Sequence, residues 1–129
     1  MDYFLAVCKD RPTDPDGFYY TVYFVNNTET EIEELSYETG GFMTDDDEII
    51  QTSRHSKVLG KVPAKSFIEV EQDDEGSFDF VIDFTFSIKK DSSKNTQLTF
   101  IINKYLRGAV KPLNPLPVLD KYGYLLKAK

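Results

Sequence analysis

The sequence predicts an all-β protein, an antiparallel β-sandwich of seven to nine strands, and three observations support this fold class. Residues 78–88 alternate between large apolar and mostly polar side chains, with Val81 as the exception. Such alternation is typical of a strand with one buried and one solvated face in an antiparallel sheet. Turn-forming residues also recur at short intervals. Finally, no long stretch has the periodicity of a helix.

The expected strands, in chain order, cover residues 3–8, 18–25, 31–37, 57–62, 66–71, 78–88, 97–105 and 122–126. The first is a short β-prone run, and the loop at 10–17 after it is dense in Asp, Pro and Gly. The second is apolar on both faces. The third is irregular, because Ile32 is out of register with Leu35 and Tyr37, and a bulge is one explanation.

Two features after the third strand favour an interruption. The pair Gly40-Gly41 is expected to break the strand, and Thr44 can then cap one helical turn. A turn at Pro63-Ala64 separates the next two strands. The polar loop at 89–95 is expected to join strands 78–88 and 97–105 into an antiparallel hairpin.

The strongest strands define the expected core. The apolar residues on their alternating faces should be buried: Val22, Phe24, Phe80, Ile82, Phe84, Phe86, Leu98, Phe100 and Ile102. The 129 residues suit one domain, 1–129, which is long enough to bury a sizeable core. Residues 108–129 contain three prolines and are expected to form an extended carboxy-terminal arm that ends in a possible edge strand.

The order of elements resembles an immunoglobulin-like sandwich. The resemblance rests on the pattern Tyr-x-Val-x-Phe-Val-Asn-Asn-Thr at 20–28, on Val-Pro-Ala-Lys-Ser-Phe-Ile-Glu-Val at 62–70, and on the long hairpin after them. The Cys–Trp–Cys core of true immunoglobulin domains is absent. The sequence also resembles the β-sandwich modules that accompany Smr-type nuclease domains. That resemblance implies an accessory role, because no nuclease motif is recognisable.

Charge and composition narrow the function classes. Residues 1–85 carry 20 acids and 6 bases, whereas residues 86–129 carry 2 acids and 9 bases. We interpret this asymmetry as neutralisation between neighbouring strands. The basic stretch at 104–111 has three bases but a single aromatic residue, Tyr105, whereas single-strand binders use several stacking aromatics, so we expect no nucleic-acid partner. No stretch is apolar enough to span a membrane, and we expect a soluble, cytoplasmic protein without a cofactor.

Two residues are candidates for nucleophilic catalysis, and both have a simpler interpretation. His55, the single histidine, lies between Ser53 and Ser56, but no orienting acid or oxyanion hole is recognisable. Cys8, the single cysteine, lies near Lys9 and Arg11, yet it ends an apolar strand, where cysteines usually act as small buried hydrophobes. A hydrolase around either residue is therefore the least favoured function.

Acidic turns offer weak candidates for a Ca²⁺ site. The carboxylates fall in three groups: Asp14 and Asp16, then Asp45, Asp46 and Asp47, then Asp73 and Asp74. Loops at one end of a sandwich can supply the oxygen ligands that Ca²⁺ requires. If residues 49–52 are not a strand, all three groups fall at the same end; if they are, the third group moves away. The alternative is that these are solvated turns.

Tyr19, Tyr23 and Val25 form a second apolar face on strand 18–25. A two-layer sandwich buries only one face of each sheet. We therefore expect this face to be covered by residues 112–126 of the same chain or by another chain. Together, these patterns favour a non-catalytic interaction or accessory module that binds a protein partner or self-associates.

Overall fold

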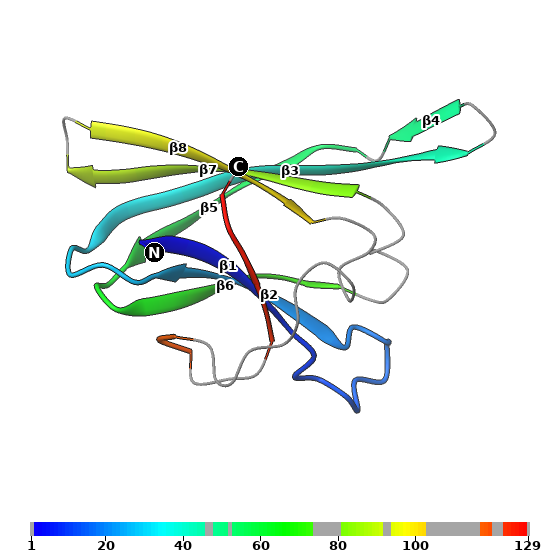
Figure 1. Ribbon diagram of the computed structural model, residues 1–129, viewed down its shortest axis with the longest axis horizontal. Coiled ribbons are helices and arrows are strands. Elements are labelled where there is room, and N and C mark those ends of the chain that lie inside the picture. Colours follow the sequence, from blue (N-terminus) through cyan, green and yellow to red (C-terminus); the bar gives the residue numbers. More distant parts are fainter. Residues whose placement is uncertain are drawn as a thin grey trace.

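The computed structural model describes residues 2–45, 48–51, 53–73, 81–91, 94–102, 117–119 and 123–128, and all regular structure in these ranges is β. The described part of the chain contains nine strands (Figure 1). They are β1 (Tyr3–Cys8), β2 (Tyr20–Asn26), β3 (Ile32–Asp45), β4 (Glu48–Gln51), β5 (His55–Val62), β6 (Ser66–Asp73), β7 (Val81–Asp91), β8 (Lys94–Ile102) and β9 (Tyr124–Leu126).

The strands form two antiparallel sheets that face each other as a sandwich (Figure 1). Sheet A has the order β6-β2-β1-β9, and sheet B has the order β4-β3-β7-β8, with β5 also paired to β3. The predicted fold class, an all-β antiparallel sandwich, is confirmed. Within the described ranges, no helix is long and apolar enough to cross a membrane.

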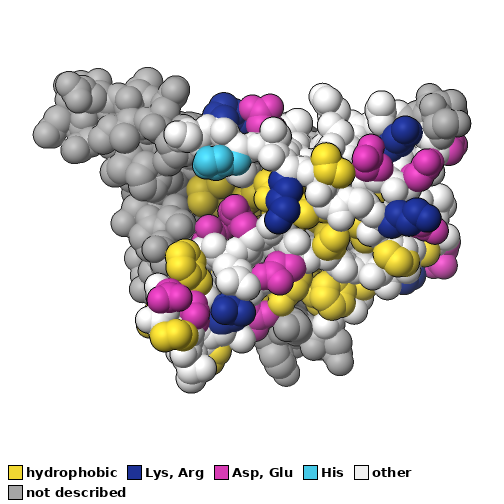
Figure 2. All heavy atoms as spheres, turned by 180° about the vertical axis from the view of Figure 1, so that it is seen from behind, with side chains coloured by type: hydrophobic (Ala, Val, Ile, Leu, Met, Phe, Trp, Pro, Cys, Tyr) yellow, Lys and Arg dark blue, Asp and Glu magenta, His cyan; other side chains and the backbone are white. Residues whose placement is uncertain are grey.

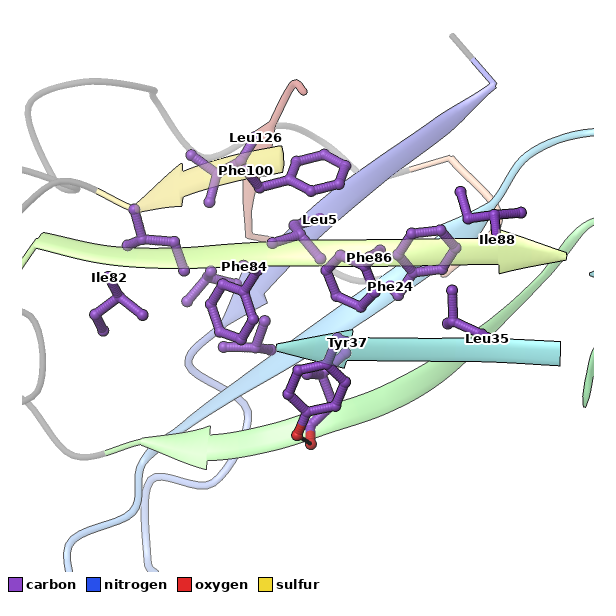
Figure 3. Close-up of a cluster of buried hydrophobic side chains, with 14 of the residues drawn as sticks. Leu5, Phe24, Leu35, Tyr37, Ile82, Phe84, Phe86, Ile88, Phe100 and Leu126 are labelled. Atoms are coloured by element: carbon purple, nitrogen blue, oxygen red, sulfur yellow. Dashed lines mark hydrogen bonds between the residues drawn. The ribbon is translucent and has the colours of Figure 1, made fainter. Parts of the chain in front are cut away.

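The core between the sheets is aromatic. Phe84 and Phe86 of β7 are fully buried, and so is Phe24 of β2 on the facing sheet. The rings of Phe24 and Phe86 lie 4.7 Å apart, and Figure 3 shows them beside Phe84 and Phe100. Of the predicted core residues, Phe80 lies outside the described residues. Leu98 is only partly buried, because it packs at the margin of the cluster on the outer strand β8.

The predicted antiparallel hairpin is present: β7 pairs with β8, and Phe84 lies opposite Phe100. The connection is shorter than expected, because β7 continues to Asp91 and β8 begins at Lys94. The prediction of a polar loop over 89–95 is therefore wrong in its length. Pairing across the two strands satisfies backbone groups that a longer loop would leave to water.

Strand β3 corrects two further predictions. It runs through Gly40-Gly41 without a break, since both residues pair with β7, and it then pairs with β4 from Phe42 to Asp45. Thr44, expected to cap a helical turn, is itself a strand residue paired with Ile49, and Asp45 pairs with Glu48. The β-branched pair Ile49-Ile50 instead continues as a strand, and the β3–β4 ribbon extends beyond the body of the sandwich (Figure 1).

A second apolar cluster lies on the outer face of sheet A. It contains Phe4, Ala6, Cys8, Tyr23, Val25 and Leu119, all buried, with Val118 and Leu125 packed against it. Leu125 belongs to β9, which forms the expected edge strand beside β1. Of the predicted arm at 108–129, residues 108–116, 120–122 and 129 lie outside the described residues.

Candidate functional site

The two candidate catalytic residues lie in different sheets: Cys8 ends β1 in sheet A, and His55 begins β5 in sheet B. Cys8 is fully buried in the second cluster, opposite Thr21 of β2. His55 begins β5, opposite Thr39, and its side chain is exposed. Figure 2 shows the face that carries this histidine, where acidic, basic and hydrophobic side chains are intermixed. A buried thiol and an isolated surface imidazole do not form a nucleophile–base pair.

The acidic turns are partly used by the fold itself. Asp14 Oδ2 accepts a hydrogen bond from the Phe18 amide at 3.0 Å, and Asp14 also lies 3.6 Å from Arg11. Asp16 is exposed at the same turn. These contacts close the β1–β2 turn and make strand β2 begin at Tyr20, two residues later than predicted. Asp14 is thus a turn-forming carboxylate.

The prediction for the third acidic group is wrong. Residues 48–51 do form a strand, yet Asp73 still lies at the end of the sandwich that carries the β1–β2 turn, because it pairs with Tyr20. The reason is that β4 and β5 run in the same direction, since both are antiparallel to β3. The additional strand β4 therefore does not change the direction of β6 or the end at which Asp73 lies. Among residues whose side chains the structure describes, no three acids, histidines or cysteines form a metal site. Asp46, Asp47 and Asp74 lie outside the described residues, and the side chain of Asp45 is not described.

The predicted apolar face on β2 is covered by the chain's own carboxy-terminal segment. Tyr23 and Val25 pack in the second cluster with Leu119, so the first of the two predicted alternatives describes these residues. The Tyr23 hydroxyl donates to Asp10 Oδ2 at 2.5 Å, and its ring meets Phe67 edge-on at 5.5 Å. Tyr19 lies before β2, and Lys9 Nζ lies 5.9 Å from its ring centroid.

A groove of about 460 Å³ lies beside strand β6, and it is the feature best suited to bind a ligand. It is lined by Phe18, Lys57, Glu69, Val70, Glu71 and Gln72. Strands β5 and β6 are both at sheet edges, one in each sheet, so the groove lies on an open side of the sandwich. Phe18 is 40% exposed at this groove and supplies an apolar surface. A groove with carboxylates and one aromatic ring is suited to a cationic, partly apolar group.

A β-bulge turns two carboxylates of β6 toward the interior. Val22 pairs with Glu71, but the next residue, Tyr23, pairs with Glu69, so Val70 is the extra residue. Residues directly opposite each other in a ladder share a face. Glu71 therefore shares the inner face with Val22, and Asp73 shares it with Tyr20. Without the bulge, the alternation along β6 would direct both acids to solvent.

The Glu71 and Asp73 carboxyls form one hydrogen-bonded pair. Burial, then the neighbouring charge of Asp73 and the hydrogen bond between the two carboxyls, together raise the pKa of Glu71 to about 8. Two adjacent carboxylates in a desolvated position cannot both ionise readily, so they retain a proton. At neutral pH this proton balances part of the acidity of the groove.

Tyr37 connects this pair to the core. Its ring belongs to the core cluster, and its hydroxyl donates to the carbonyl of Val70 at 3.4 Å, pointing away from the cluster in Figure 3. Burial raises the pKa of the Tyr37 phenol, and the charges of Glu71 and Asp73 raise it as well. The phenol therefore stays neutral and fixes the bulged backbone at the groove.

Arg54 forms a separate charged cluster on the outer face of sheet B. Its Nε donates to Glu38 at 2.6 Å, and its Nη2 donates to Asp83 at 2.7 Å. These hydrogen bonds, first to Asp83 and then to Glu38, raise the pKa of Arg54. A Cβ at position 40 would lie 2.7 Å from Nη1, so Gly40 leaves room for the guanidinium. The cluster fixes the segment before β5 on the sheet.

Sequence reasoning identified Asp73 but missed Glu69 and Glu71. The available signal was the alternating series of acids at 69, 71 and 73, which by itself indicates a solvated strand face. The basic stretch at 104–111 lies outside the described residues. No protein-family model matches the chain, and the search of curated proteins gives no match either.

Proposed function

We propose that the protein is a non-catalytic interaction module that binds a cationic, extended segment of a partner protein in the groove between β5 and β6. The observation that carries this proposal is the pair of inward-turned carboxyls, Glu71 and Asp73, beside that groove. A lysine or arginine side chain would replace the shared proton, and Phe18 would contact the apolar part of the segment.

The two edge strands support an extended ligand, since an edge presents backbone groups that a partner strand can pair with. Both edges also carry a bulge, at Val70 in β6 and at Leu59 in β5, next to Gly60 with φ 93°. A bulge interrupts the ladder, so backbone pairing would be short. Side-chain contacts to the acids would therefore determine specificity.

The strand order also supports the immunoglobulin-like assignment, which we retain as part of the proposal. In sheet A, β1, β2 and β6 lie side by side, and in sheet B, β3, β7 and β8 lie side by side. Constant-type immunoglobulin sandwiches place their first, second, fourth and fifth strands in one sheet and their third, sixth and seventh strands in the other. The grouping of β1, β2 and β6 against β3, β7 and β8 follows this division, whereas β4 and β5, which pair with β3 in sheet B, depart from it. Many such domains serve in recognition, and a cytoplasmic location remains a prediction.

The test is a titration of the ¹⁵N-labelled protein with two short peptides that differ only in charge. Acetyl-Thr-Val-Lys-Val-Thr-amide should shift amide resonances of β5 and β6, and the Glu counterpart should shift them much less. Glu71→Gln combined with Asp73→Asn should weaken binding of the lysine peptide, whereas Ser87→Ala, on the outer face of sheet B, should leave its binding unchanged. Equal shifts with both peptides, or none with either, would contradict the proposal.

A further inference from the structure

Residues Pro117–Leu119 form a tight turn with an unfavourable backbone conformation. The Leu119 amide donates to the Pro117 carbonyl at 2.8 Å, and the residue between them, Val118, has φ 70°. This combination is a γ-turn of the rare, strained type. A β-branched residue is especially unfavourable at positive φ. Such a conformation persists only where the surrounding contacts compensate for it.

Those contacts are made on the outer face of sheet A. The turn places Leu119, 5% exposed, among Phe4, Tyr23 and Val25, and Val118 packs beside it. Figure 1 shows this segment, in orange, on the side of sheet A that faces away from sheet B. The cover is incomplete, because Phe67, which touches the Tyr23 ring, remains 38% exposed. We call residues 117–119 the latch.

The strand that follows the latch is held by few interactions. β9 has three residues and pairs with only Leu5, Ala6 and Val7 of β1. In the sequence, 21 residues, 103–123, separate the end of β8 from β9. A chain of this length can extend over about 70 Å, at about 3.3 Å per residue. The latch and β9 can therefore reach the same face of a neighbouring molecule.

We propose that the latch and β9 exchange between two copies of this chain, so that the outer face of sheet A is a self-association surface. The occupant follows from complementarity, because this face of sheet A and its edge strand β1 already accept Val118, Leu119 and β9, and a second copy presents the same residues. Exchange of an identical element is a known route to dimers. The surface is distinct from the β5–β6 groove, so this inference stands independently of the proposed function.

Concentration sets the balance between the closed monomer and the exchanged dimer. Within one chain the latch is present at a high effective concentration, so the closed monomer predominates in dilute solution. The strain at Val118 lowers the stability of the closed latch. A chain whose own latch cannot close should accept the latch of another chain.

The test uses the full chain with Leu119→Asp, which places a charge where the latch is buried and leaves the receiving face intact. A fluorescent peptide of residues 115–128 should bind this variant at least about tenfold more tightly than the wild type, whose face is occupied. The same peptide carrying Leu119→Asp is the matched control and should not bind. Light scattering should find the variant alone monomeric and a mixture with wild type partly dimeric.

Leu119→Ala serves as a milder variant if circular dichroism finds that Leu119→Asp does not fold. Two results would overturn the proposal: equal binding of the peptide to folded variant and wild type, or a mixture that remains monomeric after prolonged incubation below the melting temperature. Dimers of Leu119→Asp alone, at the concentration of the mixture, would also contradict it, since they would require a different surface.

Discussion

At the scale of single residues, burial and charge distinguish the core from the groove. Phe84 is fully buried between Tyr37 and Phe86, with ring centroids 6.0 Å from each. Phe84→Ala should lower the free energy of unfolding by about 3–5 kcal/mol, because it removes the ring and leaves a cavity. Urea denaturation measures this loss. Leu98→Ala, at the partly buried margin, should cost less, and equal losses would contradict the assigned packing.

Glu71 provides a pH-dependent prediction at the same scale. Its pKa is about 8 in the folded protein, raised from 4.5. The folded state therefore holds a proton that the unfolded state releases, and this stabilisation is complete below about pH 4.5 and lost as pH rises through about 8. The groups that face this carboxyl are Asp73 on β6, Tyr37 on β3 and Lys57 on β5.

Glu71→Gln replaces the protonated carboxyl with a neutral amide of similar shape. We expect it to raise the melting temperature relative to wild type at pH 9 and to change it little at pH 5. Glu69→Gln, on the exposed face of the same strand, is the control and should not produce this difference. Melting curves that shift equally at both pH values would show that Glu71 does not carry the buried proton.

Val118 tests backbone strain. In most positions alanine is more favourable than glycine, but at φ 70° a Cβ is unfavourable. Val118→Gly should therefore be more stable than Val118→Ala by about 1 kcal/mol, since left-handed conformations cost L-residues about 1–2 kcal/mol. Both variants lose the valine packing, so their difference isolates the backbone. The reverse order in urea denaturation would exclude strain at this turn.

At the scale of elements, the alternation of apolar and polar residues predicted the buried face of a strand where pairing was regular. It failed where a β-bulge shifted the pairing. The pattern around Phe84 continues through β7 without interruption, so its buried face could be predicted from sequence. Strand β6 has an equally regular pattern, but the extra residue Val70 reverses the faces of Glu71 and Asp73. Nothing local marks Val70 as a bulge, because its position depends on how β6 pairs with β2.

The β3–β4 ribbon illustrates a second limit of local patterns. Gly40-Gly41 and Thr44 are typical of a strand end and a helix cap, yet pairing with β7 and then with β4 keeps this segment extended. Glycine at 40 has a tertiary reason, the approach of Arg54 from a distant part of the sequence. A local sequence pattern around Gly40 therefore cannot indicate this requirement, because Arg54 approaches only in the folded sheet.

Position within the sheets predicts the local stability of each element. Strand β7 pairs on both sides, with β3 and β8, whereas β9 is a three-residue strand at the edge of sheet A. Hydrogen exchange should therefore be slowest for amides of β7 and β2 and fastest for those of β9 and β4. Mass spectrometry of deuterated peptides measures this order. Protection of β9 equal to that of β7 would argue against an exchangeable carboxy-terminal segment.

At the scale of the whole molecule, acidic residues outnumber basic ones, so electrostatic repulsion affects stability. The net charge is −7, and the ion pairs of Lys61 with Glu31 and of Lys65 with Glu29 lie at the surface, with separations of 3.9 Å and 3.6 Å. Exposed pairs of this kind contribute little, whereas repulsion among excess acids opposes the compact state throughout. Salt screens both over a Debye length of about 10 Å at 0.1 M.

We therefore expect the melting temperature to rise between low and moderate NaCl concentration, because screening removes more repulsion than attraction. A matched variant sharpens the test: Glu29→Gln removes one acid and one weak ion pair, so it should reduce the salt dependence. Thermal denaturation at fixed pH measures both effects. A melting temperature that falls with added NaCl would mean that ion pairs, among them those of Arg54 with Glu38 and Asp83, outweigh the repulsion of the net charge.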